Sequence, residues 1–209
     1  MKSTPGQAAS VFIHDRALVE TDTIGSGTRI WAFAHVMAGA AIGEDCQICD
    51  HVFLESGCRI GRGVTIKNNA LVWEGVTIGD YAFIGPHVVF TNDRYPRSPR
   101  HPEWKERLAV KRNWLVETVV EEGASLGANA VILCGVRLGR YCLVAAGSVV
   151  THDVPPHGLV AGNPARFIGY VGHSGRRLRE TPEGWIEPFS GTVYRLNEGK
   201  MERSGDRIA

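Results

Sequence analysis

The sequence predicts an all-β fold in which short strands stack as the coils of a parallel β-helix. Two series of residues carry this prediction, and both repeat every six positions. The first series is apolar throughout and comprises Phe12, Leu18, Ile24, Ile30, Val36, Ile42, Ile48, Leu54, Ile60, Ile66, Val72, Ile78, Ile84 and Phe90, followed by Trp114, Val120, Leu126, Ile132, Leu138, Val144 and Val150. The series fails at Pro96 and Pro102 and then resumes in the same frame. Because only 44% of the chain is apolar, so long a series marks residues that fill a core.

The second series lies four positions after the first and consists of small residues. It comprises Thr28, Ala34, Ala40, Cys46, Val52, Cys58, Val64, Ala70, Val76, Ala82 and Val88, followed by Thr118, Ala124, Ala130, Val136, Cys142 and Ser148. This spacing fits neither the period of a helix nor the alternation of a lone strand. It fits a short strand and a tight corner, and three such units make a triangular coil of eighteen residues.

The corners and the cysteines agree with this interpretation. Glycine recurs every eighteen residues at positions 25, 43, 61 and 79, where a tight corner favours it. Three of the five cysteines, Cys46, Cys58 and Cys142, fall in the small-residue series and are explained as core residues. Cys46 and Cys49 form a C-x-x-C pair, but no second pair follows, so we expect no metal there.

The net charge, the lengths of apolar runs and the cysteine spacing limit the binding partners and cellular locations that we expect. The net charge of +1 implies no basic face for nucleic acid. No apolar run approaches the roughly 20 residues that cross a bilayer. Residues 1–10 lack the apolar core of a signal peptide, and we expect a disordered lead-in there. The cysteine spacing shows no disulfide framework. These features predict a cytoplasmic protein with reduced cysteines and no membrane segment.

We expect the β-helix to cover residues 11–155, with a loop over 91–113. Prolines 96, 99 and 102 prevent continuous strand pairing in that loop, and seven Lys or Arg residues make it basic. A basic loop of this length favours a functional role in binding phosphates. Two prolines, at 155 and 156, end the coils. Residues 156–209 form a C-terminal extension, for which we expect a short helix within 164–180 and a β-hairpin over 185–203 that turns at Asn197-Glu198-Gly199.

Residues eighteen apart stack about 4.8 Å from one another, the spacing of neighbouring strands. His51, Asn69 and His87 therefore form one column, and Asn92 begins the loop five residues after His87. Neighbouring columns carry Trp73 and Glu74. The sequence thus predicts a cluster of polar groups at the base of the loop, although solvated corner residues would give the same pattern.

Several segments together resemble one family. Gly85-Pro86-His87-Val88-Val89-Phe90 and Thr91-Asn92-Asp93-Arg94-Tyr95-Pro96-Arg97 resemble the active-site segment of the nucleotide-linked 3-amino-sugar N-acetyltransferases, a branch of the hexapeptide-repeat acyltransferases. Thr28-Arg29-Ile30-Trp31, Lys67-Asn68-Asn69 and Gly162-Asn163-Pro164-Ala165-Arg166 agree with it. The tail resembles the branch that acetylates UDP-2-acetamido-3-amino-2,3-dideoxyglucuronate. Glu187-Pro188 stands where tails of that branch often carry Cys-Pro, which argues against a metal in the tail.

The resemblance implies what the spacing alone does not. It implies a left-handed β-helix, an exception to the usual right-handed crossover. It also implies a homotrimer with active sites between subunits, and transfer of acetyl from acetyl-CoA to the 3-amino group of a UDP- or dTDP-linked sugar. Such a product serves lipopolysaccharide O-antigen or related surface polysaccharide. No metal is implied.

The resemblance and the columns together give expected roles. Placing the amine near the thioester and donating hydrogen bonds to the oxyanion supply most of the catalysis. Asn69 and Asn92 are expected to orient the amine or sugar, and His87 is the candidate base. The expected substrate-binding residues are His51, Trp73, Glu74, Asp93, Arg94, Tyr95 and Arg97. The expected residues for acetyl-CoA are Gly127, Ala128, Ala145 and Ala146, whose small side chains leave a groove, with Asn163 continuing the column and Arg166 meeting a phosphate.

Three alternatives remain open. A metalloenzyme of the γ-carbonic-anhydrase type needs three histidines on zinc; His51 and His87 have that spacing, but Asn92 stands in the third place. A hydroxyl acetyltransferase needs a stronger base, such as His87 held by a carboxylate. A non-catalytic scaffold is the third alternative, against which the basic loop argues.

Overall fold

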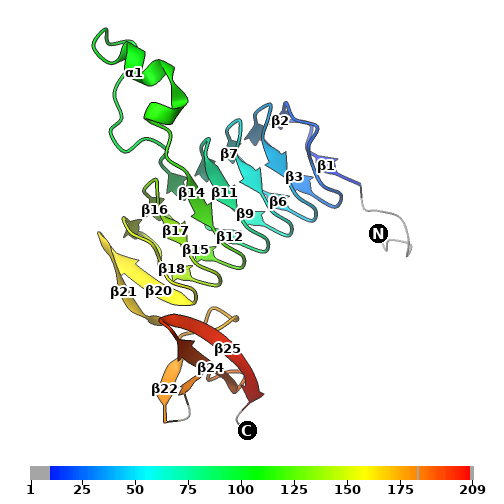
Figure 1. The fold of residues 1–209 in the computed structure, drawn as a ribbon. Helices are drawn as coiled ribbons and strands as arrows, with labels where there is room; N and C mark the ends of the chain where they lie inside the picture. Colours follow the sequence, from blue (N-terminus) through cyan, green and yellow to red (C-terminus); the bar gives the residue numbers. More distant parts are fainter. Residues whose placement is uncertain (1–9, 183, 208–209) are drawn as a thin grey trace.

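The computed structural model describes residues 10–182 and 184–207, and within them the chain winds into a left-handed parallel β-helix (Figure 1). The predicted lead-in, residues 1–10, lies outside the described residues apart from Ser10. Most coils contribute one strand of two or three residues to each of three sheets, which we name A, B and C. The coils stack along one axis, and the C-terminal extension lies at the far end of the stack.

The three sheets form the faces of a triangular prism. Sheet A contains β1 (Phe12–Ile13), β3 (Arg29–Ile30), β6 (Gln47–Ile48), β9 (Thr65–Ile66), β12 (Phe83–Ile84), β15 (Ser125–Leu126), β18 (Leu143–Val144), β20 (Gly158–Gly162) and β21 (Ala165–Tyr170). Sheet B contains β2 (Leu18–Val19), β4 (His35–Val36), β7 (Phe53–Leu54), β10 (Leu71–Val72), β13 (Val89–Phe90), β16 (Val131–Ile132) and β19 (Val149–Val150). Sheet C contains β5 (Ala41–Ile42), β8 (Arg59–Ile60), β11 (Val76–Ile78), β14 (Thr118–Val120) and β17 (Arg137–Leu138). The chain passes from A to B to C, and the corners are named A/B, B/C and C/A.

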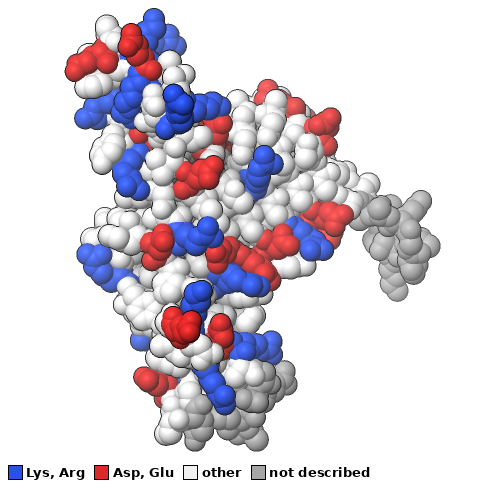
Figure 2. All heavy atoms as spheres, viewed as in Figure 1, with Lys and Arg blue, Asp and Glu red and all other residues white. Residues whose placement is uncertain are grey.

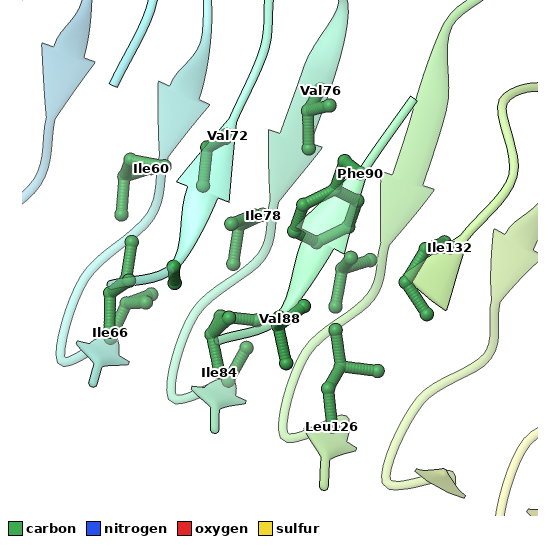
Figure 3. Close-up of a cluster of buried hydrophobic side chains, with 14 of the residues drawn as sticks. Ile60, Ile66, Val72, Val76, Ile78, Ile84, Val88, Phe90, Leu126 and Ile132 are labelled. Atoms are coloured by element: carbon green, nitrogen blue, oxygen red, sulfur yellow. The ribbon is translucent and has the colours of Figure 1, made fainter. Parts of the chain in front are cut away.

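The core is the inside of the prism, filled as the two series predict (Figure 3). Ile84 and Leu126 stack in neighbouring coils and are both fully buried. Burying each such side chain stabilises the fold by about 1.5–3 kcal/mol. Cys58 and Cys142 occupy small inward positions, where burial raises the pKa of each thiol to about 12. These two thiols are therefore packing residues with little thiolate character.

The first coil departs from the predicted frame. Ile13 pairs with Ile30 and Val19 with Val36, so the inward residues are one position later than the series gives. Leu18, which the series places inside, is 55% exposed, whereas at the open end of the stack Phe12 and Ile13 are both exposed, at 36% and 45%. The chain is one residue short between β2 and the next coil, and a shift of one residue moves every side chain of a strand to its other face.

The loop leaves the B/C corner and protrudes from the coils (Figure 1). We call residues 91–117 the excursion; it contains α1 (Lys105–Ala109) and a 3-10 turn, η1 (Lys111–Asn113). The predicted core position of Trp114 is wrong, because this residue ends the 3-10 turn and its Nε1 donates to the Leu108 carbonyl at 3.1 Å. Neither helix carries a buried residue. No helix among the described residues is long and apolar enough to cross a membrane.

The coils continue beyond Pro156. Leu138 is bridged to Val154, only sixteen residues later, and β18 pairs in parallel with β20, so the stack reaches Gly162. The short helix predicted within 164–180 is wrong, because β21 folds back antiparallel on β20 instead. That segment contains poor helix formers, and β20 offers it an open edge.

The remaining extension is a four-stranded antiparallel sheet, the C-terminal sheet. It comprises β22 (Arg179–Thr181), β23 (Gly184–Ile186), β24 (Thr192–Asn197) and β25 (Lys200–Arg207). The predicted turn lies between β24 and β25, with Glu198 and Gly199 at φ +47° and +77°. Tyr194 reaches back from this sheet to His157 on the last coil, with ring centroids 5.3 Å apart. The C-terminal sheet therefore packs on the end of the β-helix.

Candidate active site

One polar column runs along the A/B corner. His51, Asn69 and His87 all adopt left-handed backbone, with φ between +58° and +61°. Each of their amides donates to a carbonyl of the preceding coil, at 3.0–3.2 Å. Left-handed backbone is rare outside glycine and is several-fold enriched in Asn and His. The backbone of the corner thus accounts for these residue types as well as their alignment.

A second polar group lies at the B/C corner, where the excursion begins. The Asn92 amide Nδ2 donates to the Glu74 carbonyl at 3.4 Å, and the Val116 amide donates to the Asn92 carbonyl at 2.9 Å. Asp93 is bridged to Leu115, which closes the neck of the excursion. Trp73 lies beside this group and packs on Phe53, with ring centroids 5.3 Å apart.

Within one chain these two groups do not form the single cluster that the sequence suggested. Strand β13 runs between His87 and Asn92, and five residues of extended chain span about 16 Å. We call the A/B column the first half-site and the Glu74–Asn92–Asp93 group the second half-site. His51 and His87 are two coils apart, about 10 Å, so both cannot bind one zinc ion from the same chain.

Two carboxylates that were expected to bind substrate instead brace the excursion. Arg107 Nη2 lies 3.3 Å from both carboxylate oxygens of Asp93, whose side chain is 13% exposed. Lys111 Nζ lies 2.7 Å from Glu74 Oε1. The sequence did not reveal Arg107 and Lys111 as the partners of these carboxylates. The seven cations of the segment predicted anion binding, but their spacing does not show which of them pair with carboxylates of the same chain.

The three other predicted residues of the excursion are exposed. Tyr95 is 70% exposed, and Arg97 donates to the Pro96 carbonyl at 2.9 Å. The Arg94 guanidinium lies over Gly135, where a Cβ would stand 2.6 Å from Nη2. Arg94 also lines a groove of about 880 Å³ beneath the excursion. The groove is further lined by Thr91, Leu133, Cys134, Thr151 and His152.

The small residues expected to bind acetyl-CoA continue the first half-site toward the C-terminal end. Gly127 follows Gly85 at the A/B corner, and Ala145 follows Gly127. A Cβ on Gly127 would stand 2.4 Å from the Ala146 nitrogen, so this position admits no side chain. Ala128 lies beside Gly127, and Ala146 is exposed.

Asn163 does not continue this column. Leu143 pairs with Leu159, sixteen residues later, so Ala161 follows Ala145. The cause is the shortened last coil, which omits two residues between Val150 and Val154. Asn163 and Arg166 lie instead near the turn from β20 to β21 and are both exposed.

The outer face of sheet B differs from that of sheet C. The outward residues of sheet B are Leu18, His35, Phe53, Leu71, Val89, Val131 and Val149, all apolar except the histidine. Those of sheet C are Ala41, Arg59, Thr77, Val119 and Arg137. Sheet B joins the A/B and B/C corners, so a continuous apolar face separates the two half-sites.

Comparison with known proteins agrees with this architecture. The family model described as bacterial transferase hexapeptide (six repeats) matches residues 23–56, 57–92 and 117–152. The dTDP-3-amino-3,6-dideoxy-α-D-galactopyranose 3-N-acetyltransferase of Aneurinibacillus thermoaerophilus is 49% identical over 160 residues, which cover 77% of this chain and 78% of that protein. Serine acetyltransferase 4 of Arabidopsis thaliana is 27% identical over 175 residues, covering 78% of this chain and 42% of that protein.

Solved structures give the same family. A hexapeptide-repeat acetyltransferase of Vibrio cholerae in complex with acetyl-CoA is 31% identical, with a TM-score of 0.53, covering 64% of this chain and 72% of that chain. The acetyltransferase domain of PglB from Neisseria gonorrhoeae is similar in fold at 22% identity, with a TM-score of 0.50 and coverage of 78% and 60%. On its repeats, its coils and these relatives, the chain belongs to the bacterial hexapeptide transferase family.

Proposed function

We propose that this protein transfers acetyl from acetyl-CoA to the 3-amino group of a UDP- or dTDP-linked sugar, for surface polysaccharide such as O-antigen. One observation carries the proposal: a 3-N-acetyltransferase acting on a dTDP-3-amino sugar is 49% identical over 77% of the chain. The geometry supports it. The polar first half-site and the small residues expected to bind acetyl-CoA share the A/B corner, which supports a reaction between acceptor and donor near His87.

The reaction requires few chemical groups from the protein. The amine nitrogen attacks the thioester carbonyl, the C–S bond breaks, and CoA leaves as a thiol with the proton that the amine loses. His87 is the candidate base, and its column reaches the donor groove at the next coil, since β12 pairs with β15. Asn69 and Asn92 orient the amine, which contributes through proximity. No step in this scheme uses a metal ion.

Lys and Arg side chains gather on the excursion (Figure 2), where they would bind the phosphates of a nucleotide-linked sugar. Five of its seven cations have no carboxylate within 4.0 Å among the described residues: Arg94, Arg97, Arg100, Lys105 and Arg112. Arginine binds phosphate oxygens in pairs, which suits Arg94 and Arg97 to the nucleotide. Tyr95, His51 and Trp73 would contact the acceptor, and Arg166 a phosphate of CoA.

A homotrimer would reunite the two half-sites. The apolar outer face of sheet B needs a partner. In a closed ring of identical subunits the contact is head to tail, so if sheet B faces the axis, the A/B corner of one copy meets the B/C corner of the next. His87 would then face Asn92 of the neighbouring copy.

A cytoplasmic location fits the cysteine chemistry. All five cysteines are free thiols, as in chains kept in a reducing compartment. A hydroxyl acceptor is less well supported than an amine, because Glu74 and Asp93, the carboxylates available to hold His87, are already paired with Lys111 and Arg107.

An acetyl-CoA turnover assay that follows thiol release tests the proposal. UDP- and dTDP-linked 3-amino sugars are offered in parallel, with the matching 3-hydroxy sugars as controls. We expect turnover with an amino sugar and none with its hydroxy counterpart. Acetyl-CoA binding without turnover of any amino sugar would favour a hydroxyl acceptor. Failure to bind CoA would favour a scaffold.

A further inference from the structure

The excursion has no core of its own. Between residues 94 and 113 no side chain is buried, and α1 lacks a side-chain cap at its N-terminus. Five residues of helix without a cap or a buried face are not stable alone. Contacts with the B/C corner must therefore hold this segment in place.

Two ion pairs are among those contacts. Arg107, on α1, pairs with Asp93, and its guanidinium also lies 3.4 Å from the Tyr95 carbonyl. Lys111, on η1, pairs with Glu74. The apolar contribution is small: Leu115 packs over Gly75, where a Cβ would stand 3.2 Å from Leu115 Cδ1.

Both pairs act on the residues around Asn92. Glu74, which Lys111 holds by its carboxylate, accepts the Asn92 amide on its own carbonyl. The Glu74 amide in turn donates to Glu55 Oε2 at 2.7 Å, which ties it to the preceding coil. Asp93, which Arg107 holds, is the next residue after Asn92. With one Nδ2 hydrogen bonded to the corner, the side chain is oriented so that Asn92 Oδ1 can accept a hydrogen bond from a bound amine.

We propose that Arg107 and Lys111 are positioning residues that form a latch: Arg107 holds α1 against Asp93 at the base of the excursion, Lys111 ties η1 to Glu74 at the B/C corner, and together they hold Asn92 in place. This inference rests on the proposed function. The two ion pairs differ in their exposure to solvent. The side chains of Lys111 and Glu74 are 64% and 21% exposed, whereas those of Arg107 and Asp93 are 31% and 13% exposed. Desolvated pairs cost more to break than exposed ones.

The test combines kinetics with proteolysis. Arg107→Met should lower kcat with the amino sugar about tenfold or more, and Lys111→Met at most about fivefold. The KM for acetyl-CoA should stay within about twofold for both, because neither cation is among the residues expected to bind acetyl-CoA. Arg107→Lys and Lys111→Arg should recover most of the loss. Arg62→Met, which breaks the Arg62–Asp80 pair at the C/A corner, is the matched control and should behave as wild type.

The rate of limited trypsin cleavage shows how firmly the excursion is held, and this measurement does not depend on acetyl transfer. Cleavage after Arg97 and Arg100 should be faster in both Met variants than in wild type or in Arg62→Met. The exchanged pair Glu74→Lys with Lys111→Glu should return cleavage toward the wild-type rate. If no amino sugar is acetylated, faster cleavage still supports the latch while the proposed function fails. If acetylation proceeds and both Met variants match wild type in kcat and cleavage, the latch is wrong.

Discussion

At each A/B corner one residue adopts a left-handed backbone conformation, and this requirement restricts which side chains are found there. Every coil needs a residue with positive φ there, and the chain meets that need with Phe33, His51, Asn69 and His87 in succession. Phe33 and His51 stack, with ring centroids 4.9 Å apart. Asn and His tolerate this conformation and also carry hydrogen-bonding groups. The corner geometry thus favours Asn and His in this column, and Gly127 and Ala145, which are expected to bind acetyl-CoA, lie at the same corner in the coils that follow.

Asn92→Ala tests the second half-site directly. We expect kcat to fall about 10²-fold, because a displaced acceptor loses the benefit of positioning. The fold should persist, since Asn92 donates only a 3.4 Å hydrogen bond from its side chain. Asn197→Ala, which removes an amide bonded to Glu202 in the C-terminal hairpin, serves as control. Wild-type turnover in Asn92→Ala would remove this residue from the site.

The coils show which parts of the architecture a sequence can predict. A strand of two residues has one inward and one outward position, so a core of stacked coils forces the six-residue series that the sequence displays. The first and last coils break the frame because each is shorter at one corner, between Val19 and Ile24 and between Val150 and Val154. No local signal marks those deletions. They explain why Phe12, Leu18 and Asn163 were misplaced.

The excursion and the extension were harder to predict for a different reason. Prolines revealed where pairing stops, but the partners of Arg107 and Lys111 depend on how a segment without a core folds back. The β21 strand forms because β20 presents an edge, which is a tertiary property. The division of the candidate site into two half-sites follows from which corner each column occupies, and the eighteen-residue count alone does not relate the corners to one another.

The C-terminal sheet docks through a cluster that responds to pH. His157 is 5% exposed, stacks on Tyr141 and has Nδ1 2.9 Å from the Val171 carbonyl. Burial lowers the pKa of His157 to about 4, and the neighbouring His173 and Arg140 add to this, opposed by the Val171 carbonyl and by Glu187. Burial also lowers the pKa of His173, with Arg203 contributing.

Acidification should therefore loosen the C-terminal sheet. Between about pH 6.5 and 4 the unfolded state binds a proton at His157 that the folded state does not, so stability falls as pH falls, by at most about 1.4 kcal/mol per unit for this group. Hydrogen exchange of residues 184–204 should rise from pH 7 to pH 5 relative to the coils. His157→Phe keeps the stack and should flatten this dependence; an unchanged slope would contradict it.

The two half-sites lie at opposite edges of sheet B, and this separation bears on the oligomeric state. A single chain presents the polar column of the first half-site at one edge of an apolar face and the excursion at the other edge. Only a second copy, laid against that face, would bring the two edges together. If copies assemble in this way, activity requires assembly, and we expect a single chain to be inactive.

Leu71→Glu, in the middle of the outer face of sheet B, tests this view. A buried charge without a partner should prevent association, leaving a particle near the chain mass of 22.8 kDa by light scattering and no acetyl transfer. Thr77→Glu places the same charge on the outer face of sheet C and should keep the mass and activity of wild type. A Leu71→Glu protein of undiminished mass would show that another face makes the contact.

The place of the excursion in the chain also sets the order of folding events. Leu71 pairs with Val89, eighteen residues later, but Val89 pairs with Val131, forty-two residues later. Closing the longer loop costs about 0.7 kcal/mol more in chain entropy, a factor of about three in rate. We expect the coils before and after the excursion to form as separate nuclei that join last across β13 and β16. A chain with the excursion shortened should refold about threefold faster in stopped-flow mixing, so the segment proposed to bind substrate would also be the part of the fold that closes most slowly.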